Sequence, residues 1–154
     1  MSNEPRNMRN ESNSKIKESS TRTSYLVPRT SKIVTFKDLN AWKEGHELVL
    51  MTYRLTKRFP KDELFALTSQ MRRAAVSITS NIAEGFGRSG VNDRAHFYTI
   101  AHGSVTELQN QLLVSRDVGY ISDVEFENVE IQSVIVHKIL TGLIRATKAR
   151  AQEI

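Results

Sequence analysis

The sequence predicts an all-α protein, an up-down-up-down antiparallel four-helix bundle that follows a disordered N-terminal tail. Three observations carry this prediction. Apolar residues recur every three or four positions from Phe36 onward, Pro60 and Gly119 interrupt that pattern, and no segment alternates apolar and polar residues as a strand does. Helices of similar length joined by short turns pack as antiparallel neighbours.

The first 32 residues differ in composition from the rest of the chain. Fourteen of them are Ser, Thr or Asn, and seven Lys/Arg stand against three Asp/Glu. Their one apolar cluster, Tyr25-Leu26-Val27, buries too little surface to offset the entropy lost on ordering the backbone. We therefore expect a disordered basic tail over residues 1–32 and a bundle over residues 36–149. The tail is either a solvated leader or an arm that binds phosphate through counterion release.

Pro60 separates the first two helices. The first is expected over residues 38–59, and its apolar stripe consists of Leu39, Trp42, His46, Val49 and Tyr53. The second is expected from about Asp62 to Gly85, where glycine supplies a C-terminal cap. Its apolar face consists of Leu67, Met71, Ala74, Ala75, Ile78 and Ile82.

Capping signals bound the last two helices. Asn92 is the expected N-cap of the third helix, and Gly119 closes it. Its inner side consists of Phe97, Ala101, Ser104, Leu108, Leu112 and Ser115. Ser122 and Glu125 form an S-x-x-E capping box, which opens a fourth helix that ends near Ala149. Its apolar positions are Val129, Val136, Ile139, Leu140 and Leu143.

The first two helices also carry apolar residues away from these faces. At 100° per residue they form a second apolar side, which in a monomeric bundle would face water. We therefore expect self-association, with scattered surface hydrophobes as the alternative. The predicted interface consists of Ala41, Leu48, Leu55, Phe59, Phe65, Val76 and Ala83.

Composition argues against several classes of protein. The chain of 154 residues has no cysteine, so it has no disulfide, thiolate metal site or thiol nucleophile. Its longest aliphatic run, Leu48-Val49-Leu50-Met51, is shorter than a membrane span or a signal peptide requires. We expect a cytoplasmic protein that does not contact a membrane.

The sequence contains few candidate catalytic or metal-binding motifs. The chain contains neither Glu-x-x-His nor H-E-x-x-H, and no serine lies on a G-x-S-x-G elbow. Its histidines are His46, His96, His102 and His137, and no two are spaced four apart. For His46 we expect a packed, hydrogen-bonded side chain. We predict no catalytic site, no metal and no cofactor, and hence no enzyme.

A glycine-rich segment, residues 85–90, matches the G-x-G-x-x-G pattern of dinucleotide sites. That fingerprint needs a preceding strand, whereas a helix is expected to run into this segment. A helix cap and a turn account for the same glycines. The start of the third helix, beside Arg88 and Arg94, remains a candidate anion site, because free N–H groups and the helix dipole favour negative charge there.

Polar side chains flank the apolar face of the second helix. Counted outward from the turn near Ser89, Arg73 and Glu107 lie at the same height on adjacent antiparallel helices. We expect an ion pair between them, with Ser77 and Asn81 nearby, since buried polar groups require partners. The set forms a structural network or, as the alternative, a ligand site. It consists of Arg73, Ser77, Asn81, Glu84, Ser104 and Glu107.

Basic residues concentrate at one pole of the expected bundle, where the first helix begins, the second and third meet, and the fourth ends. This predicted nucleic-acid-binding set is Lys37, Lys43, Arg88, Arg94, Arg145, Lys148 and Arg150. At the opposite pole, acids accompany Arg54, Lys57, Arg58, Lys61 and Arg116. Binding at the basic pole should depend on salt and only weakly on sequence. A solvated basic surface that complements helix dipoles is the alternative.

Three segments resemble a known family. They are residues 70–88 (QMRRAAVSITSNIAEGFGR), residues 100–108 (IAHGSVTEL) and the opening residues 36–42 (FKDLNAW). They are similar to the four-helix-bundle proteins encoded in 23S rRNA intervening sequences, also labelled S23 ribosomal proteins. The resemblance spans about residues 36–149, and Thr79 stands where the family often has proline.

The resemblance implies a homopentameric ring of bundles and no enzyme activity. It also implies a related fold in the accessory variability protein of diversity-generating retroelements, which binds nucleic acid and partners a reverse transcriptase. From residues and resemblance together we expect a homo-oligomeric adaptor that binds RNA or DNA through its basic rim, and possible contact with a protein partner such as a reverse transcriptase. The alternative is a structural or regulatory assembly module without nucleic-acid affinity.

Overall fold

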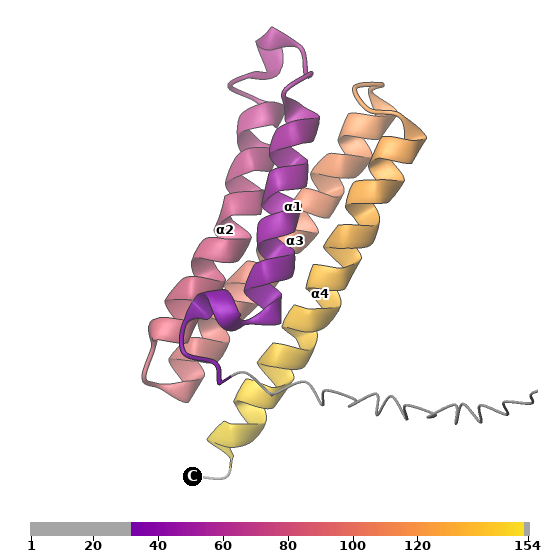
Figure 1. Ribbon diagram of the computed structural model, residues 1–154. Helices are drawn as coiled ribbons and strands as arrows, with labels where there is room; N and C mark the ends of the chain where they lie inside the picture. Colours follow the sequence, from indigo (N-terminus) through magenta and orange to yellow (C-terminus); the bar gives the residue numbers. More distant parts are fainter. Residues whose placement is uncertain (1–31, 153–154) are drawn as a thin grey trace, which may run out of the picture. The chain divides into compact units, whose positions relative to one another are not determined.

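The computed structural model describes residues 32–152, which form four helices. They are α1 (Asn40–Thr56), α2 (Leu67–Gly87), α3 (Val91–Asp117) and α4 (Asp123–Ala151). Single 3₁₀ turns, Phe36–Asp38 and Lys61–Glu63, precede α1 and α2, and this part of the chain contains no strand. The predicted all-α bundle is confirmed (Figure 1). Apart from Lys32, the predicted tail lies outside the described residues.

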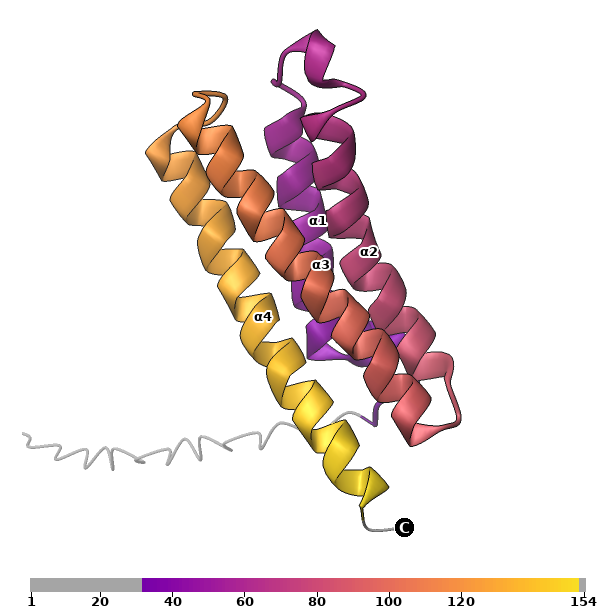
Figure 2. The ribbon, with the colours of Figure 1, turned by 180° about the vertical axis from the view of Figure 1, so that it is seen from behind.

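The four helices form a closed ring of neighbours. The backbones of α1 and α2, α2 and α3, α3 and α4, and α4 and α1 lie side by side, whereas no Cα atoms of either diagonal pair of these helices approach within 8 Å. Successive helices run in opposite directions, as Figures 1 and 2 show from two sides. The start of α1, the α2–α3 turn and the end of α4 therefore lie at one end of the bundle. The α1–α2 and α3–α4 connections lie at the opposite end.

Local capping chemistry sets most helix boundaries. The capping box of α4 is present, since Glu125 N–H donates to Ser122 Oγ at 3.2 Å and Ser122 N–H donates to Glu125 Oε2 at 2.9 Å. Gly119 has φ +84° just beyond α3, a left-handed conformation that favours glycine. α3 begins at Val91, and its N-cap is Gly90, two residues before the expected N-cap Asn92. Prediction and structure thus agree at Ser122 and Gly119 and differ at Asn92, which lies inside α3.

α1 is shorter than expected at both ends. Leu39 has an extended ψ of 128° and is the N-cap, so α1 starts at Asn40. α1 ends at Thr56, and Pro60, which lacks an N–H, then directs the chain into the second 3₁₀ turn. α2 starts later than Asp62 because Glu63 Oε2 accepts the Leu67 N–H at 3.1 Å and caps the helix there.

The inner face of α1 differs from the predicted one. The buried positions are Ala41, Gly45, Leu48, Thr52, Leu55 and Thr56. Leu48 is fully buried, whereas Tyr53 is 39% exposed and His46 is exposed. His46 stacks on Trp42 with ring centroids 4.8 Å apart, rather than packing in the core as expected. The helix is therefore rotated relative to the aromatic stripe that the sequence suggested.

Close helix approach explains this rotation. A Cβ on Gly45 would lie 3.3 Å from Thr79 Cγ2 and 3.5 Å from Ile78 Cγ2, so α1 meets α2 where α1 has no side chain. Thr52 and Thr56 tolerate burial because their hydroxyls donate to Leu48 O at 2.8 Å and Thr52 O at 2.9 Å. Glycine and threonine interrupt the hydropathy pattern while preserving the helical spacing of this face.

Gly85 also has a different role from the predicted one. α2 continues past it to Gly87, and Arg88 is the C-cap. A Cβ on Gly85 would lie 2.7 Å from Tyr98 Cε1 and 3.1 Å from Arg94 O. Gly85 is therefore a contact point that lets α3 approach α2, and it does not cap the helix.

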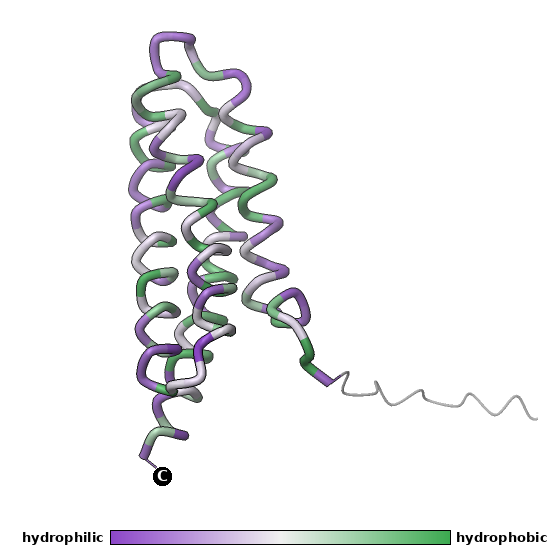
Figure 3. Tube along the Cα trace, turned by 90° about the vertical axis from the view of Figure 1, so that its left-hand side faces the viewer, coloured by the Kyte–Doolittle hydropathy of each residue, from purple (hydrophilic) through white to green (hydrophobic). Residues whose placement is uncertain are grey.

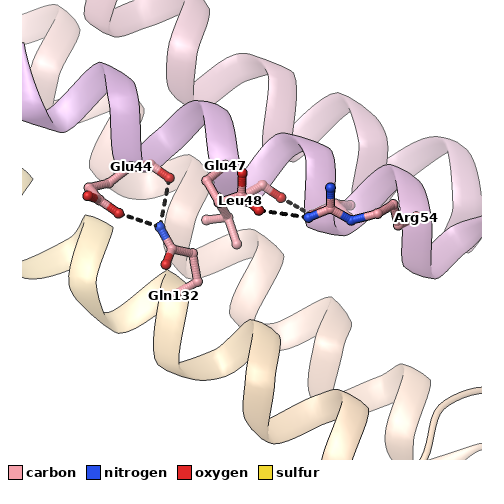
Figure 4. A network of polar contacts seen from close by, with 6 residues as sticks. Glu44, Glu47, Leu48, Arg54 and Gln132 are labelled. Atoms are coloured by element: carbon pink, nitrogen blue, oxygen red, sulfur yellow. Dashed lines mark hydrogen bonds and ion pairs between the residues drawn. The ribbon is translucent and has the colours of Figure 1, made fainter.

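Hydrogen bonds between polar residues connect α1 to α4. Gln132 Nε2 donates to Glu44 O at 3.0 Å and to Glu44 Oε2 at 2.8 Å (Figure 4). One turn along α1, Glu47 forms an ion pair with Arg54 at 2.7 Å. Since Leu48 lies between these contacts and is fully buried, they border the core at this interface.

The burial of α1 corrects the predicted interface. Ala41, Leu48, Leu55 and Phe59 are at most 8% exposed within the single chain, so their apolar character does not indicate a partner. Phe65 and Val76 are 93% and 39% exposed, Ala83 is half-buried, and their contact with another copy stays a prediction. Apolar and polar segments alternate along every helix in Figure 3.

Replacing Leu48 with alanine should lower the free energy of unfolding by about 2–5 kcal/mol, because a fully buried side chain would leave a cavity. Leu50→Ala, at a position that is 40% exposed, should cost no more than about 1 kcal/mol. Urea unfolding followed by circular dichroism measures both. Equal losses would show that α1 is rotated differently.

Candidate nucleic-acid interface

Five of the seven predicted phosphate-binding residues are exposed and unpaired. The structure places them at the end of the bundle where α1 begins and α4 ends, which we call the basic end. Lys37, Lys43, Arg145, Lys148 and Arg150 are exposed, and none has an ion-pair partner among residues 32–152. Their positive charges are therefore available to a ligand from solution.

The other two predicted residues, Arg88 and Arg94, are partly engaged at the α2–α3 turn. Arg88 forms an ion pair with Glu84, and its guanidinium lies 4.7 Å from the centre of the Phe97 ring. Arg94 donates to Arg88 O at 2.7 Å. These contacts order the turn, and they leave Arg88 and Arg94 less free to bind phosphate than the five exposed residues.

Acids at the basic end are few and already occupied in part. Asp38 Oδ2 accepts the N–H groups of Thr35 at 2.8 Å and Val34 at 2.9 Å. These backbone hydrogen bonds lower the pKa of Asp38 below its usual value. Glu44 accepts from Gln132, and Glu84 pairs with Arg88.

At the opposite end of the bundle, the arginines form ion pairs with neighbouring acids. Arg58 pairs with Glu125, and Arg116 pairs with Asp117 at 2.9 Å. The Ser122 N–H and the Arg58 guanidinium lower the pKa of Glu125. With Arg54 paired to Glu47, the exposed cations without an ion pair at this end are Lys57 and Lys61 among the described residues. Free positive charge is thus concentrated at the basic end.

The predicted polar set is divided in the structure. Ser77 Oγ lies 2.8 Å from Ser104 Oγ and joins α2 to α3. Asn81 Nδ2 donates to Ser77 O at 2.8 Å and to Ser77 Oγ at 3.1 Å. Glu84 instead pairs with Arg88, one turn further along.

The expected ion pair between Arg73 and Glu107 is not formed. Both residues are exposed and line one cavity of about 450 Å³, so the predicted height is right. Their charged groups nevertheless lie more than 4.0 Å apart, and Glu107 Oε1 accepts from Gln111 Nε2 at 3.1 Å. Long charged side chains gain little from pairing in water, which leaves this cavity open.

Metal-ligating side chains do not cluster in the described part of the chain. No group of three His, Asp or Glu residues is placed to hold an ion. His102 and His137 touch across α3 and α4, with ring centroids 4.0 Å apart. Burial and the neighbouring His137 lower the pKa of His102, which favours the neutral ring.

A second cavity, which the sequence analysis did not foresee, opens beside α1 and α2. This α1/α2 cavity has a volume of about 630 Å³. Its walls include Tyr53, Phe65, Thr68, Arg72, Arg73 and Ser80. Arg72 Nε donates to Thr56 Oγ1 at 2.9 Å, and its guanidinium lies 4.8 Å from the centre of the Tyr53 ring. The cavity lining includes residues to which the sequence assigned other roles: Phe65 and Val76 in the predicted interface, and Arg73 and Ser77 in the predicted polar set.

A family model of the 23S rRNA-intervening sequence proteins matches residues 37–142. The chain belongs to this family. The match covers all four helices except the last turns of α4. It includes Lys37, Lys43, Arg88 and Arg94 of the basic end, whereas Arg145, Lys148 and Arg150 follow the matched segment.

A solved structure shares the fold of this family member. It is the crystal structure of a protein of unknown function from the S23 ribosomal protein family of Bacteroides thetaiotaomicron VPI-5482. The TM-score is 0.64 at 22% sequence identity, and the match covers 68% of this chain and 95% of that chain. No curated protein matches the chain significantly. None of the helices in the described residues is long and apolar enough to cross a membrane.

Removing the charge of Arg73 should change stability very little, because no ion pair is lost. Arg73→Ala and Glu107→Ala should each alter the free energy of unfolding by about 0.5 kcal/mol or less, and the double variant should be additive. Denaturant unfolding of the three variants gives the coupling energy. A coupling above about 1 kcal/mol would show that the two charges do pair in solution.

Proposed function

We propose that this 23S rRNA-intervening sequence family member is a non-enzymatic adaptor that binds RNA or DNA through the basic end. The observation that supports it is the contrast between the two ends: five exposed cations without ion pairs lie at one, and the arginines at the other are paired. Phosphate contacts made by such residues supply affinity without reading sequence.

The proposal includes a homo-oligomer, which the family resemblance would make a pentameric ring. An exposed apolar stripe on α4 supports self-association. Val124, Ile131 and Ile135 follow one another at steps of seven and four residues and are 67%, 54% and 39% exposed. A ring with parallel subunits would place every basic end on one rim, where weak phosphate contacts act together.

A protein partner completes the adaptor. The resemblance to the accessory protein of diversity-generating retroelements makes a reverse transcriptase the partner to test, with the bound strand as its template. The rival function is an assembly module without nucleic-acid affinity. It is favoured by the cations in the last turns of α4, which would also stabilise that helix end through its dipole.

Replacing Arg145, Lys148 and Arg150 together with glutamine should weaken binding to RNA and to duplex DNA. Each lost phosphate contact lowers the slope of log affinity against log salt by about 0.7–0.9, so we expect a slope flatter by about 2–3. Fluorescence anisotropy at several salt concentrations measures it.

The matched control removes the same charge from the opposite end. Arg54, Lys57 and Arg58 replaced by glutamine should change affinity and slope much less, because Arg54 and Arg58 are held in ion pairs. Equal effects of the two triple variants would contradict binding at the basic end. Absence of binding by the unaltered chain would favour the assembly module.

Ile131→Glu should dissociate the oligomer while leaving the helices folded, since a charge buried at an interface without a partner is costly. Leu113→Glu, at a position on α3 that is 40% exposed, is the control and should not change the mass. Light scattering gives the mass, and circular dichroism gives the helix content. If both variants keep the original mass, the contact lies elsewhere, and a monomeric unaltered chain would rule out self-association.

A further inference from the structure

The volume, the lining side chains and the position of the α1/α2 cavity make it a candidate ligand site separate from the basic end. Its volume of about 630 Å³ lies within the range of small-molecule sites. Aromatic rings, guanidinium groups and hydroxyls share its walls. It also lies apart from the basic end, because Phe65 belongs to the α1–α2 connection at the opposite end of the bundle.

The aromatic part of the cavity is unusually accessible. Phe65 is 93% exposed, so its ring adds almost nothing to the core. Tyr53 is 39% exposed and carries the Arg72 guanidinium over its ring. An exposed ring beside arginine is the arrangement on which single-stranded nucleic acids stack their bases.

The charged part of the cavity favours an anion. Arg72 is held in place by Thr56, whereas Arg73 has no hydrogen-bond or ion-pair partner within residues 32–152. None of the residues lining the cavity is acidic. A fixed guanidinium next to a free one can bind a phosphate through charge-assisted hydrogen bonds.

A buried hydroxyl also lacks a partner. Thr68 is 3% exposed and lines the cavity, yet its Oγ1 makes no hydrogen bond with any described residue. Buried hydroxyls in native proteins are nearly always hydrogen-bonded. Thr68 Oγ1 itself is covered by its neighbours, so a bound molecule would reach it only after a small shift of the cavity wall, whereas the more accessible Ser69 and Ser80 on the same wall can bind polar groups directly.

We propose that the α1/α2 cavity binds a nucleotide, with the base against Phe65 and the phosphate on Arg73. This inference deepens the proposed function and rests on it, since it names the part of a nucleic acid that the cavity holds. The nucleotide is either an unpaired residue of a strand or a free mononucleotide. The two guanidinium groups and the absence of an acid on the wall match an anionic ligand, and contact with a second copy of the chain is the competing outcome that the mass measurement below detects.

The first test compares a labelled single-stranded RNA with a blunt duplex of the same length. Phe65→Ala should weaken single-strand binding about 5- to 150-fold, the range for loss of one stacked base, and leave duplex binding unchanged. Phe65→Tyr should restore the affinity. Val118→Ala, which removes another exposed apolar side chain, should change neither affinity.

The second test concerns the phosphate. Arg73→Gln should flatten the salt dependence of single-strand binding by about one contact, and Lys138→Gln, the exposed control on α4, should not. NMR titration with adenosine monophosphate and with adenosine identifies the source of the ligand. Chemical-shift changes around Phe65 on addition of the monophosphate, which should be absent in Arg73→Gln, would support the nucleotide site. Tight strand binding with weak monophosphate binding identifies an unpaired nucleotide, and the reverse identifies a free one.

Failure of this inference differs from failure of the proposed function. If the triple variant at the basic end loses binding while Phe65→Ala and Arg73→Gln do not, the basic end binds nucleic acid and the cavity does not. If the unaltered chain binds neither strand nor duplex, the proposed function fails. The titration with adenosine monophosphate then tests the cavity by itself, and the absence of chemical-shift changes around Phe65 would overturn the nucleotide site. A change in mass of Phe65→Ala would make the cavity a contact between copies and would also overturn the inference.

Discussion

The structure depends on how closely α2 approaches the two helices beside it. Gly45 of α1 faces Thr79 and Ile78 of α2, and Gly85 of α2 lies beneath the Tyr98 ring of α3. A side chain on Gly85 would clash with the Tyr98 ring, and one on Gly45 would be tight against the Thr79 methyl group, so both contacts set the distance at which the larger core residues interdigitate. Since α1 turns its small residues inward, its aromatic residues lie at the edges of the bundle. Tyr53 thereby comes to line a cavity instead of filling the core.

The four helices could be predicted because their signals are local. The Ser122 capping box, Gly119 and the spacing of Met71, Ile78 and Ile82 each act within one or two turns. The rotation of α1 could not be predicted in the same way. Hydropathy counts Gly45 and Thr52 as breaks, although the glycine permits the helix contact and the threonine satisfies its own hydroxyl.

The candidate sites were predictable only where sequence order fixes position. The basic end follows from the alternation of helix direction, which places the start of α1 beside the end of α4. The same reasoning correctly placed Arg73 and Glu107 at one level along the bundle axis, but it wrongly predicted that their charged groups touch. The separation of these groups depends on side-chain conformation across an open cavity. The α1/α2 cavity needs Tyr53 from one helix, Phe65 from a connection and Arg73 from another helix, and no spacing rule relates these residues.

Under the proposed function and the proposed nucleotide site, the basic end and the cavity would bind different parts of the same ligand. Arg73 and Arg88 are fifteen residues apart on α2 and its cap, or roughly 22 Å at the rise of an α-helix. A flexible single strand several nucleotides long can follow that distance and place an unpaired base in the cavity. A duplex cannot offer such a base without unpairing it, and it would use the basic end alone. Binding at one site would raise the effective concentration of the strand at the other, so the proposed pair of sites would favour unpaired strands even though neither contact reads sequence.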